Sequence, residues 1–178
     1  MKPEKIIHRH GQIVDNLRRL PRKMLQIHGL DNATEFVLHE LCSKDCFNIS
    51  KAAYFIDNPD FNHLKGVVGV SANELANVVN IWENPDLFTQ QMVQSPFNQT
   101  VRSFTCESRK RRDQSEHDFA KTIAQELGLK DYGFYSWDMK HDNHGFLVCE
   151  KNTTDEADCP QDDVIVDGLS LLSFCPVH

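Results

Sequence analysis

The feature that most constrains the fold is a pair of apolar runs joined by a short polar turn. The runs at 49–56 and 64–70 are rich in β-branched, aromatic and small apolar residues, and residues 57–62 between them are mostly Asp, Asn and Pro. These residue types reverse the direction of a chain, and Pro59 has no N–H to donate to a strand ladder. The pattern predicts an antiparallel hairpin over about 49–70, in the middle of a sheet.

A second hairpin is predicted over about 132–151. Its first part places Tyr135, Trp137 and Met139 at alternate positions, which is the spacing of one face of a strand. The segment 141–145 reads His-Asp-Asn-His-Gly and supplies the turn, after which an apolar run returns.

Residues from about 3 to 28 predict a long, basic, amphipathic helix. Its apolar residues recur at helical spacing and form one stripe, which consists of Ile6, Ile13, Leu17, Leu20, Met24 and Ile27. We expect Pro21 to kink or split the helix, because proline removes a backbone hydrogen bond. The stripe fits either packing on the chain's own core or the seam of a dimer, and its short, interrupted repeat favours the former.

Two further segments carry local signals. Ser71 and Glu74 have the spacing of a capping box and predict a helix whose buried face extends to Trp82. The apolar residues of 164–166 and 169–174 predict a final strand, or a strand followed by a short helix.

These elements predict an α+β fold with a mainly antiparallel sheet, built from the two hairpins and packed by amphipathic helices. A chain of 178 residues is large enough for one well-buried core, so we expect a single domain over 1–178. The order of the elements lacks the strand–helix–strand alternation of a doubly wound nucleotide-binding fold.

Charge is unevenly distributed along the chain. The formal net charge is −7, whereas residues 1–30 alone carry seven Lys or Arg against two acidic residues. The overall charge argues against general nucleic-acid binding. Residues 150–167 are the acidic extreme, so the basic first helix could dock on an acidic surface of the same chain or of a partner. One functional hypothesis is therefore a non-catalytic module that dimerises or binds a protein partner through this helix.

The sequence contains no apolar run long enough to span a membrane and no leader with a cleavage site. We therefore expect a soluble, cytoplasmic protein that does not bind membranes. In that compartment its six cysteines are expected to be reduced thiols or metal ligands.

Two sets of Cys and His residues are candidate metal sites. His39, Cys42 and Cys46 would lie on one face if their helix continued that far, and thiolate and imidazole ligands suit Zn²⁺ or another transition metal. A fourth ligand would have to come from elsewhere in the chain, and a buried free cysteine is the ordinary alternative.

The second candidate set is His141, His144 and Cys149. The two histidines belong to the predicted turn of the second hairpin, where chelation is sterically feasible. Cys159 and the acidic residues Asp162 and Asp163 follow in sequence. The ordinary alternative is a turn with exposed histidines.

Catalytic signals are sparse. His117 and Asp118 form a His-Asp pair, although the dipole at a helix start explains the acidic residue better. A low-pKa cysteine would need a cationic neighbour, and Cys106 precedes the basic run 109–112. The glycines of Lys65–Gly69 do not match a phosphate loop, and we expect them to allow another backbone or a ligand close to the strand.

The favoured functional hypothesis is an intracellular domain that binds a metal ion or a small molecule through Cys and His side chains. The alternatives are the dimerisation or partner-binding module described above and an enzyme that uses a thiol or the His-Asp pair. The substrate, ligand and oligomeric state do not follow from the sequence.

Overall fold

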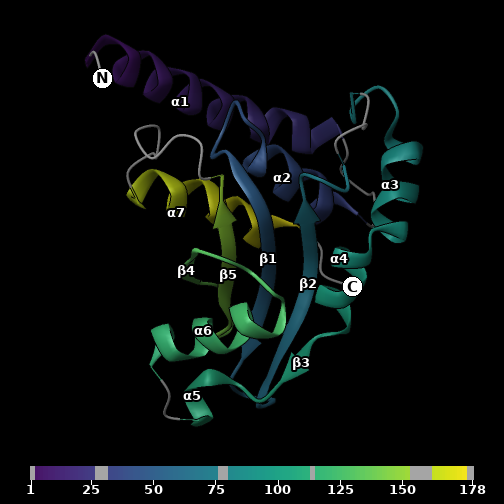
Figure 1. Cartoon of the computed structure of the whole chain (residues 1–178), viewed down its shortest axis with the longest axis vertical. Coiled ribbons are helices and arrows are strands. Elements are labelled where there is room, and N and C mark those ends of the chain that lie inside the picture. The colour runs from purple at the N-terminus through teal and green to yellow at the C-terminus, as the bar shows by residue number, and fades with distance from the viewer. Residues whose placement is uncertain (1–2, 27–31, 76–79, 113–114, 153–161, 176–178) are drawn as a thin grey trace.

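Both predicted hairpins are present, and they join in one antiparallel sheet with the strand order β3-β2-β1-β5-β4 (Figure 1). The computed structural model describes residues 3–26, 32–75, 80–112, 115–152 and 162–175. The strands are β1 (Ile49–Asn58), β2 (His63–Ser71), β3 (Thr105–Cys106), β4 (Tyr132–Asp138) and β5 (His144–Lys151). The α+β prediction is confirmed.

Helices cover both faces of the sheet. They are α1 (Pro3–Gln26), α2 (Ala33–Cys42), α3 (Pro85–Gln94), α4 (Pro96–Ser103), α5 (Arg109–Arg112), α6 (Glu116–Glu126), α7 (Asp162–Ser170) and the 3-10 helix η2 (Leu171–Phe174). One apolar cluster joins α1, α2, α3, α7 and η2 to one face of the sheet, and a second joins α4 and α6 to the other face (Figure 1). We call these faces the α7 face and the α6 face.

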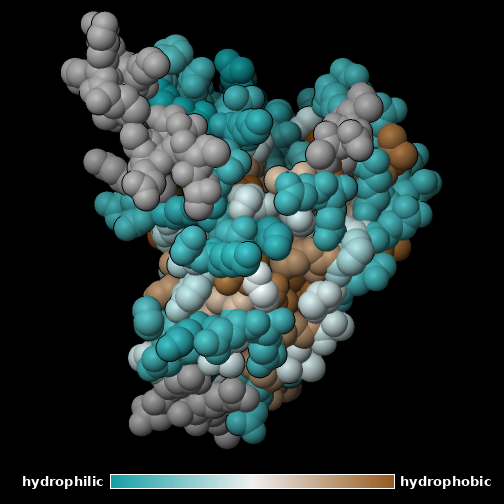
Figure 2. Space-filling model, viewed as in Figure 1, coloured by the Kyte–Doolittle hydropathy of each residue, from teal (hydrophilic) through white to brown (hydrophobic). Residues whose placement is uncertain are grey.

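Strand alternation assigns side chains to the two faces. In β1, Tyr54 packs on the α7 face and Phe55 on the α6 face, and both are fully buried. The sheet therefore has two buried faces, which is why β1 reads as a nearly continuous apolar run. In Figure 2 hydrophobic residues gather in a hollow near the centre of the view, with hydrophilic residues on the elements around it.

The glycines of β2 allow a close approach by α4, as expected from the sequence. A Cβ atom on Gly66 would lie 1.8 Å from the carbonyl oxygen of Val101, and one on Gly69 would lie 2.7 Å from a Val101 methyl carbon. The Gly69 N–H also donates to Oδ1 of Asn98 at 2.9 Å. It is thus the backbone and side chains of α4 that occupy the space above these glycines.

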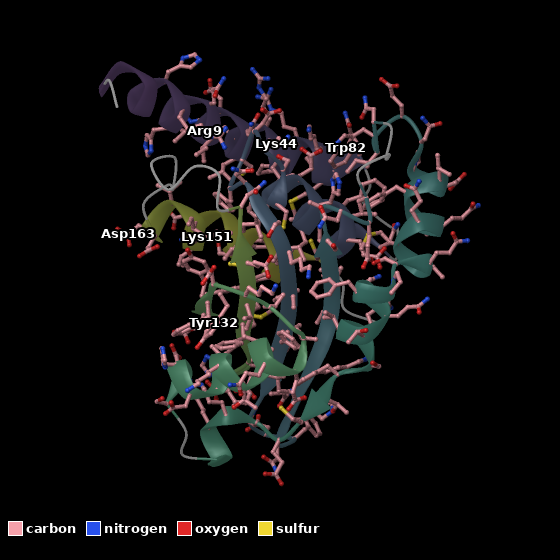
Figure 3. The ribbon with its side chains drawn as sticks, viewed as in Figure 1. Arg9, Lys44, Trp82, Tyr132, Lys151 and Asp163 are labelled. Atoms are coloured by element: carbon pink, nitrogen blue, oxygen red, sulfur yellow. The ribbon has the colours of Figure 1, made fainter. Side chains whose placement is uncertain are left out.

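Helix α1 is continuous through Pro21, so the proline does not split the helix, and the alternative of a kink stays a prediction. Its stripe residues Ile13 and Leu20 are buried against the chain's own core, which supports the favoured alternative for this helix. Nζ of Lys23 lies 2.8 Å from Oε2 of Glu40 in α2. Arg9 donates to the carbonyl oxygens of Lys44 and Cys46, and Figure 3 shows Arg9 and Lys44 close together.

Two local predictions are wrong. Ser71 is the last residue of β2, and the described residues after it form a turn; residues 76–79 of the predicted helix lie outside the described part. Glu74 does not cap that helix but accepts hydrogen bonds from Ser95 Oγ and Phe97 N at the start of α4. The predicted final strand is helical instead, as α7 and η2.

None of the helices in the described part of the chain has the length and apolar content needed to cross a bilayer.

Candidate functional site

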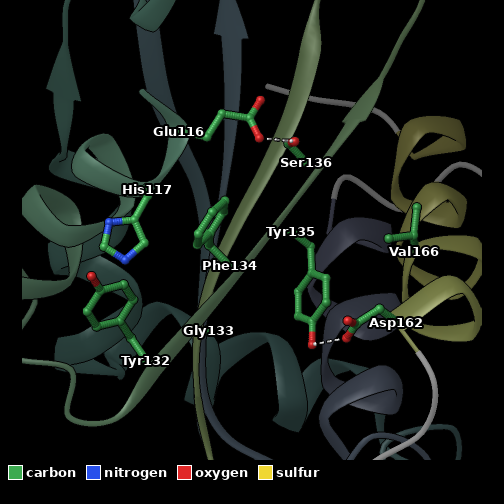
Figure 4. A pocket seen from close by; sticks show the side chains of 9 residues that line it. All are labelled: Glu116, His117, Tyr132, Gly133, Phe134, Tyr135, Ser136, Asp162 and Val166. Carbon is green, nitrogen blue, oxygen red and sulfur yellow. Dashed lines mark hydrogen bonds between the residues drawn. The ribbon is translucent and has the colours of Figure 1, made fainter. Parts of the chain in front are cut away.

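A groove of about 470 Å³ follows the outer edge of β4 (Figure 4). We call it the β4-edge groove. Residues from three elements line it, and they are Glu116 and His117 of α6, Tyr132, Gly133, Phe134, Tyr135 and Ser136 of β4, and Asp162 and Val166 of α7. Because consecutive β4 residues line it, the groove reaches around the edge of the sheet and touches both faces.

The position of β4 in the sheet creates this groove. β4 pairs with β5 on one side and is the last strand in the sheet order, so alternate backbone N–H and C=O groups point outward. The first residues of α6 border the edge on one face, and those of α7 border it on the other (Figure 4).

Three rings form the α6 side of the groove. The His117 ring centroid lies 6.5 Å from that of Tyr132 and 6.3 Å from that of Phe134, and the planes are inclined by 46° and 74°. Tyr132 and Phe134 are half-buried and His117 is exposed, so the rings remain accessible to a ligand. Such faces and edges can contact an apolar or cationic group.

Glu116 is held in place at the start of α6. Its Oε1 lies 3.2 Å from Nη2 of Arg109, and its Oε2 accepts a hydrogen bond from Ser136 Oγ at 3.0 Å. Ser115 caps the helix by accepting from the Asp118 N–H at 3.1 Å. The carboxylate of Glu116 is therefore fixed at the rim, although Arg109 compensates part of its charge.

The α7 side of the groove contains a tyrosine and a carboxylate. The Tyr135 hydroxyl donates to Oδ1 of Asp162 at 3.5 Å, and the exposed Asp162 belongs to the first turn of α7. Lys151 Nζ lies 6.0 Å from the Tyr135 ring centroid. Burial raises the pKa of Tyr135, while Lys151 opposes this shift, so the phenol stays protonated at neutral pH and can donate.

The first predicted metal set lies at the end of α2. His39 packs edge-on against the Phe88 ring, with centroids 5.2 Å apart, and burial lowers its pKa. Cys42 and Cys46 are buried, and burial raises the pKa of Cys42 well above 9 and that of Cys46 to about 12. Zinc ligation requires thiolates, so a metal ion at this place would have to displace the protons of both thiols.

The second predicted set is divided by the sheet. His141 is exposed in the β4–β5 turn, whereas Nδ1 of the partly buried His144 lies 2.9 Å from Oδ1 of Asp138. Cys149 is buried on the α7 face, while His144 shares the α6 face with Phe146, two residues further on. The structure therefore does not bring His144 and Cys149 together.

Among the described residues, no group of three or more His, Cys, Asp or Glu side chains is arranged to hold a metal ion. Both metal sets remain predictions without support in that part of the chain. The His-Asp pair is also loose, since His117 Nδ1 and Asp118 Oδ1 are 4.0 Å apart and both side chains are largely exposed. Its histidine instead lines the β4-edge groove, a role that the sequence did not indicate.

Comparisons with known proteins identify the fold. No family model matches the sequence, and no curated protein matches it. Among solved structures, the chain is similar to the GAF domain of a phosphoenolpyruvate-protein phosphotransferase from Coxiella burnetii, with a TM-score of 0.51. The match covers 92% of this chain and 89% of that chain, at 12% sequence identity. The chain therefore has a GAF-like α+β fold.

Proposed function

We propose that this protein is a non-catalytic small-molecule-binding module and that its ligand is a small organic cation bound in the β4-edge groove. The observation that carries the proposal is the combination of open aromatic rings with carboxylates at both ends of one groove. The similarity to a GAF domain supports it, because that fold serves as a small-molecule-binding regulatory module.

The dimensions of the groove suit a small ligand. Its volume of about 470 Å³ lies within the range of about 300–1,000 Å³ that is typical of small-molecule sites. An apolar body would contact Tyr132, Phe134 and Val166, and each contact would remove apolar surface from water.

The carboxylates that line the groove favour a cation over an anion, although Arg109 beside Glu116 and Lys151 beside Tyr135 offset part of their charge. Acidic residues begin both bordering helices, with Glu116 and Asp118 in α6 and Asp162 and Asp163 in α7. An ammonium or guanidinium group could lie against the rings, for about 0.5–2 kcal/mol, and donate hydrogen bonds to a carboxylate. An anionic ligand would face the same carboxylates unfavourably.

The proposal is tested with three probes that share a phenyl ring and a two-carbon chain. They are phenethylammonium, neutral 2-phenylethanol and anionic 3-phenylpropionate. Titration followed by two-dimensional NMR should show the largest amide shifts at 132–136 for the cation, smaller shifts for the alcohol and none for the anion.

Variants with a matched control locate the site. Asp162→Asn should weaken binding of phenethylammonium by about threefold to tenfold, because an exposed charge contributes about 1 kcal/mol. Asp163→Asn removes the same charge from the next residue, which does not line the groove, and should change binding much less. Equal binding of the cation and the anion, or amide shifts confined to other elements, would contradict the proposal.

A second candidate function is self-association through α1 and α7. A smaller groove of about 310 Å³ between these helices is lined by apolar residues together with Arg18 and Asp167. A twofold axis could place Arg18 of one copy opposite Asp167 of the other. Light scattering should then detect a dimer that Arg18→Asp disrupts and that the double variant with Asp167→Arg restores, whereas Arg19→Asp should have little effect.

A further inference from the structure

Unpaired buried polar atoms are concentrated at one end of the sheet. In the described part of the chain, eight buried side-chain nitrogen or oxygen atoms have no hydrogen-bond partner. Six of them belong to residues in or next to the β1–β2 turn, the β4–β5 turn and the segment between β3 and α5. These six are Oδ1 and Oδ2 of Asp57, Oδ1 of Asn62, Oγ of Ser108, Oδ1 of Asn143 and Nε2 of His144.

Asp57 is the residue of this group whose burial without a partner is most unfavourable in free energy. It is only 2% exposed, and neither of its carboxylate oxygens has a partner. A buried carboxylate without a partner is strongly unfavourable, so such groups are normally paired or bind a cation. The sheet places Asp57 directly opposite His144 of β5 and Leu64 of β2.

His144 is oriented as a ligand. Its Nδ1 lies 2.9 Å from Oδ1 of Asp138, so the ring donates its Nδ1–H to this carboxylate. Nε2 then carries a lone pair, and it is buried without a partner. A carboxylate that fixes the ring in this tautomer is the usual second partner of a metal-bound histidine.

The chemistry of the unpaired atoms identifies the missing partner. With the His144 proton on Nδ1, all six can accept a hydrogen bond or donate a lone pair, and only the Ser108 hydroxyl can also donate. The first cationic side chain after Ser108 is Arg109, and it is bound to Glu116. A neutral molecule such as water could satisfy the oxygens but would leave the negative charge of Asp57 uncompensated.

We propose that Asp57 and His144 bind a divalent metal ion at this end of the sheet, with Asp138 as a positioning residue. A carboxylate and an imidazole suit a transition metal such as Mn²⁺ or Zn²⁺. Water and unpaired side-chain oxygens at this end of the sheet would complete the coordination. This site is separate from the β4-edge groove and does not depend on the function proposed for it.

The test is titration of chelator-treated protein with Mn²⁺, followed by electron paramagnetic resonance and by thermal unfolding. We expect one ion per chain and a rise in Tm. Asp57→Asn and His144→Gln should abolish binding, and Asp138→Asn should weaken it by about 10-fold to 100-fold. His141→Gln is the matched control, because His141 belongs to the same turn but is exposed, and it should bind like the unmodified protein.

The difference in Tm between Asp57→Asn and the unmodified protein distinguishes a metal ligand from a structural residue, because it should change sign when metal is added. In chelator, Asp57→Asn should unfold at a higher temperature than the unmodified protein, because it removes a buried unpaired charge. With saturating Mn²⁺ the unmodified protein should unfold at the higher temperature. Folded protein that binds neither Mn²⁺ nor Zn²⁺ at about 1 mM would overturn the proposal. So would binding that Asp57→Asn leaves unchanged.

Discussion

Replacing Gly66 by alanine tests how α4 is seated on the sheet. The new Cβ would lie 1.8 Å from the Val101 carbonyl oxygen and 2.7 Å from its carbonyl carbon. Non-bonded heavy atoms favour separations of about 3.5–4.0 Å, so β2 and α4 would have to move apart by more than 1 Å, on the order of a bond length. The new Cβ is attached directly to the β2 backbone, and the Val101 carbonyl is part of the α4 backbone. Neither group can rotate away as a flexible side chain could.

We expect Gly66→Ala to lower the free energy of unfolding by about 3 kcal/mol or more, at the upper end of overpacking effects. That loss corresponds to a Tm lower by roughly 6–12 °C for a chain of this size. The assay is urea and thermal unfolding followed by circular dichroism, with Gly11→Ala as the control.

Gly11 lies in α1, and nothing lies within 4 Å of a Cβ placed there. Alanine should therefore stabilise that helix by about 0.5–1 kcal/mol, which is the opposite sign. If the free energy of unfolding of Gly66→Ala is within about 0.5 kcal/mol of that of the unmodified protein, α4 does not pack on β2 as described.

Three further predictions follow from the packing. Burial raises the pKa of Glu35 above 4.5, against the opposing effect of Arg102, so the folded state holds this proton more tightly than the unfolded state. Stability should thus fall as pH rises from the unfolded pKa through the folded one, and Glu35→Gln should flatten this fall in urea unfolding at about pH 4–7. Cys106 is the most accessible of the described cysteines and should react with iodoacetamide faster than the buried ones, as mass spectrometry of modified peptides can measure. In Gly145→Ala the new Cβ would lie 2.2 Å from the Trp137 ring, so tryptophan fluorescence should shift to longer wavelength as the ring is displaced.

The hairpins were predictable because their turn chemistry is local. Asp, Asn and Pro residues after β1 and the His-Asp-Asn-His-Gly segment after β4 reverse the chain regardless of their surroundings. The C-terminal error has an equally local cause. A short apolar run such as 164–166 fits a buried strand or a buried helix, and only packing against α1 and α2 decides for the helix.

The capping box at Ser71 failed because tertiary structure overrode a local signal. The sheet extends β2 to Ser71, and the Glu74 carboxylate binds the start of α4, more than 20 residues further along the chain. A two-residue motif cannot reveal such a distant partner.

The β4-edge groove was not predicted, since its residues come from three separate segments. One signal was present in the sequence: Tyr132 and Phe134 place aromatic rings on one face of an edge strand while Tyr135 and Trp137 fill the other. Which face stays accessible depends on where α6 and α7 begin, and periodicity does not contain that information.

The most direct test of the account is the paired NMR titration with phenethylammonium and 3-phenylpropionate. We expect that the cation alone shifts the amides of 132–136 and 162–166 and that Asp162→Asn reduces its affinity more than Asp163→Asn does. Equal responses to the two ions, or shifts that avoid β4 and α7, would contradict the assignment of this groove as the ligand site.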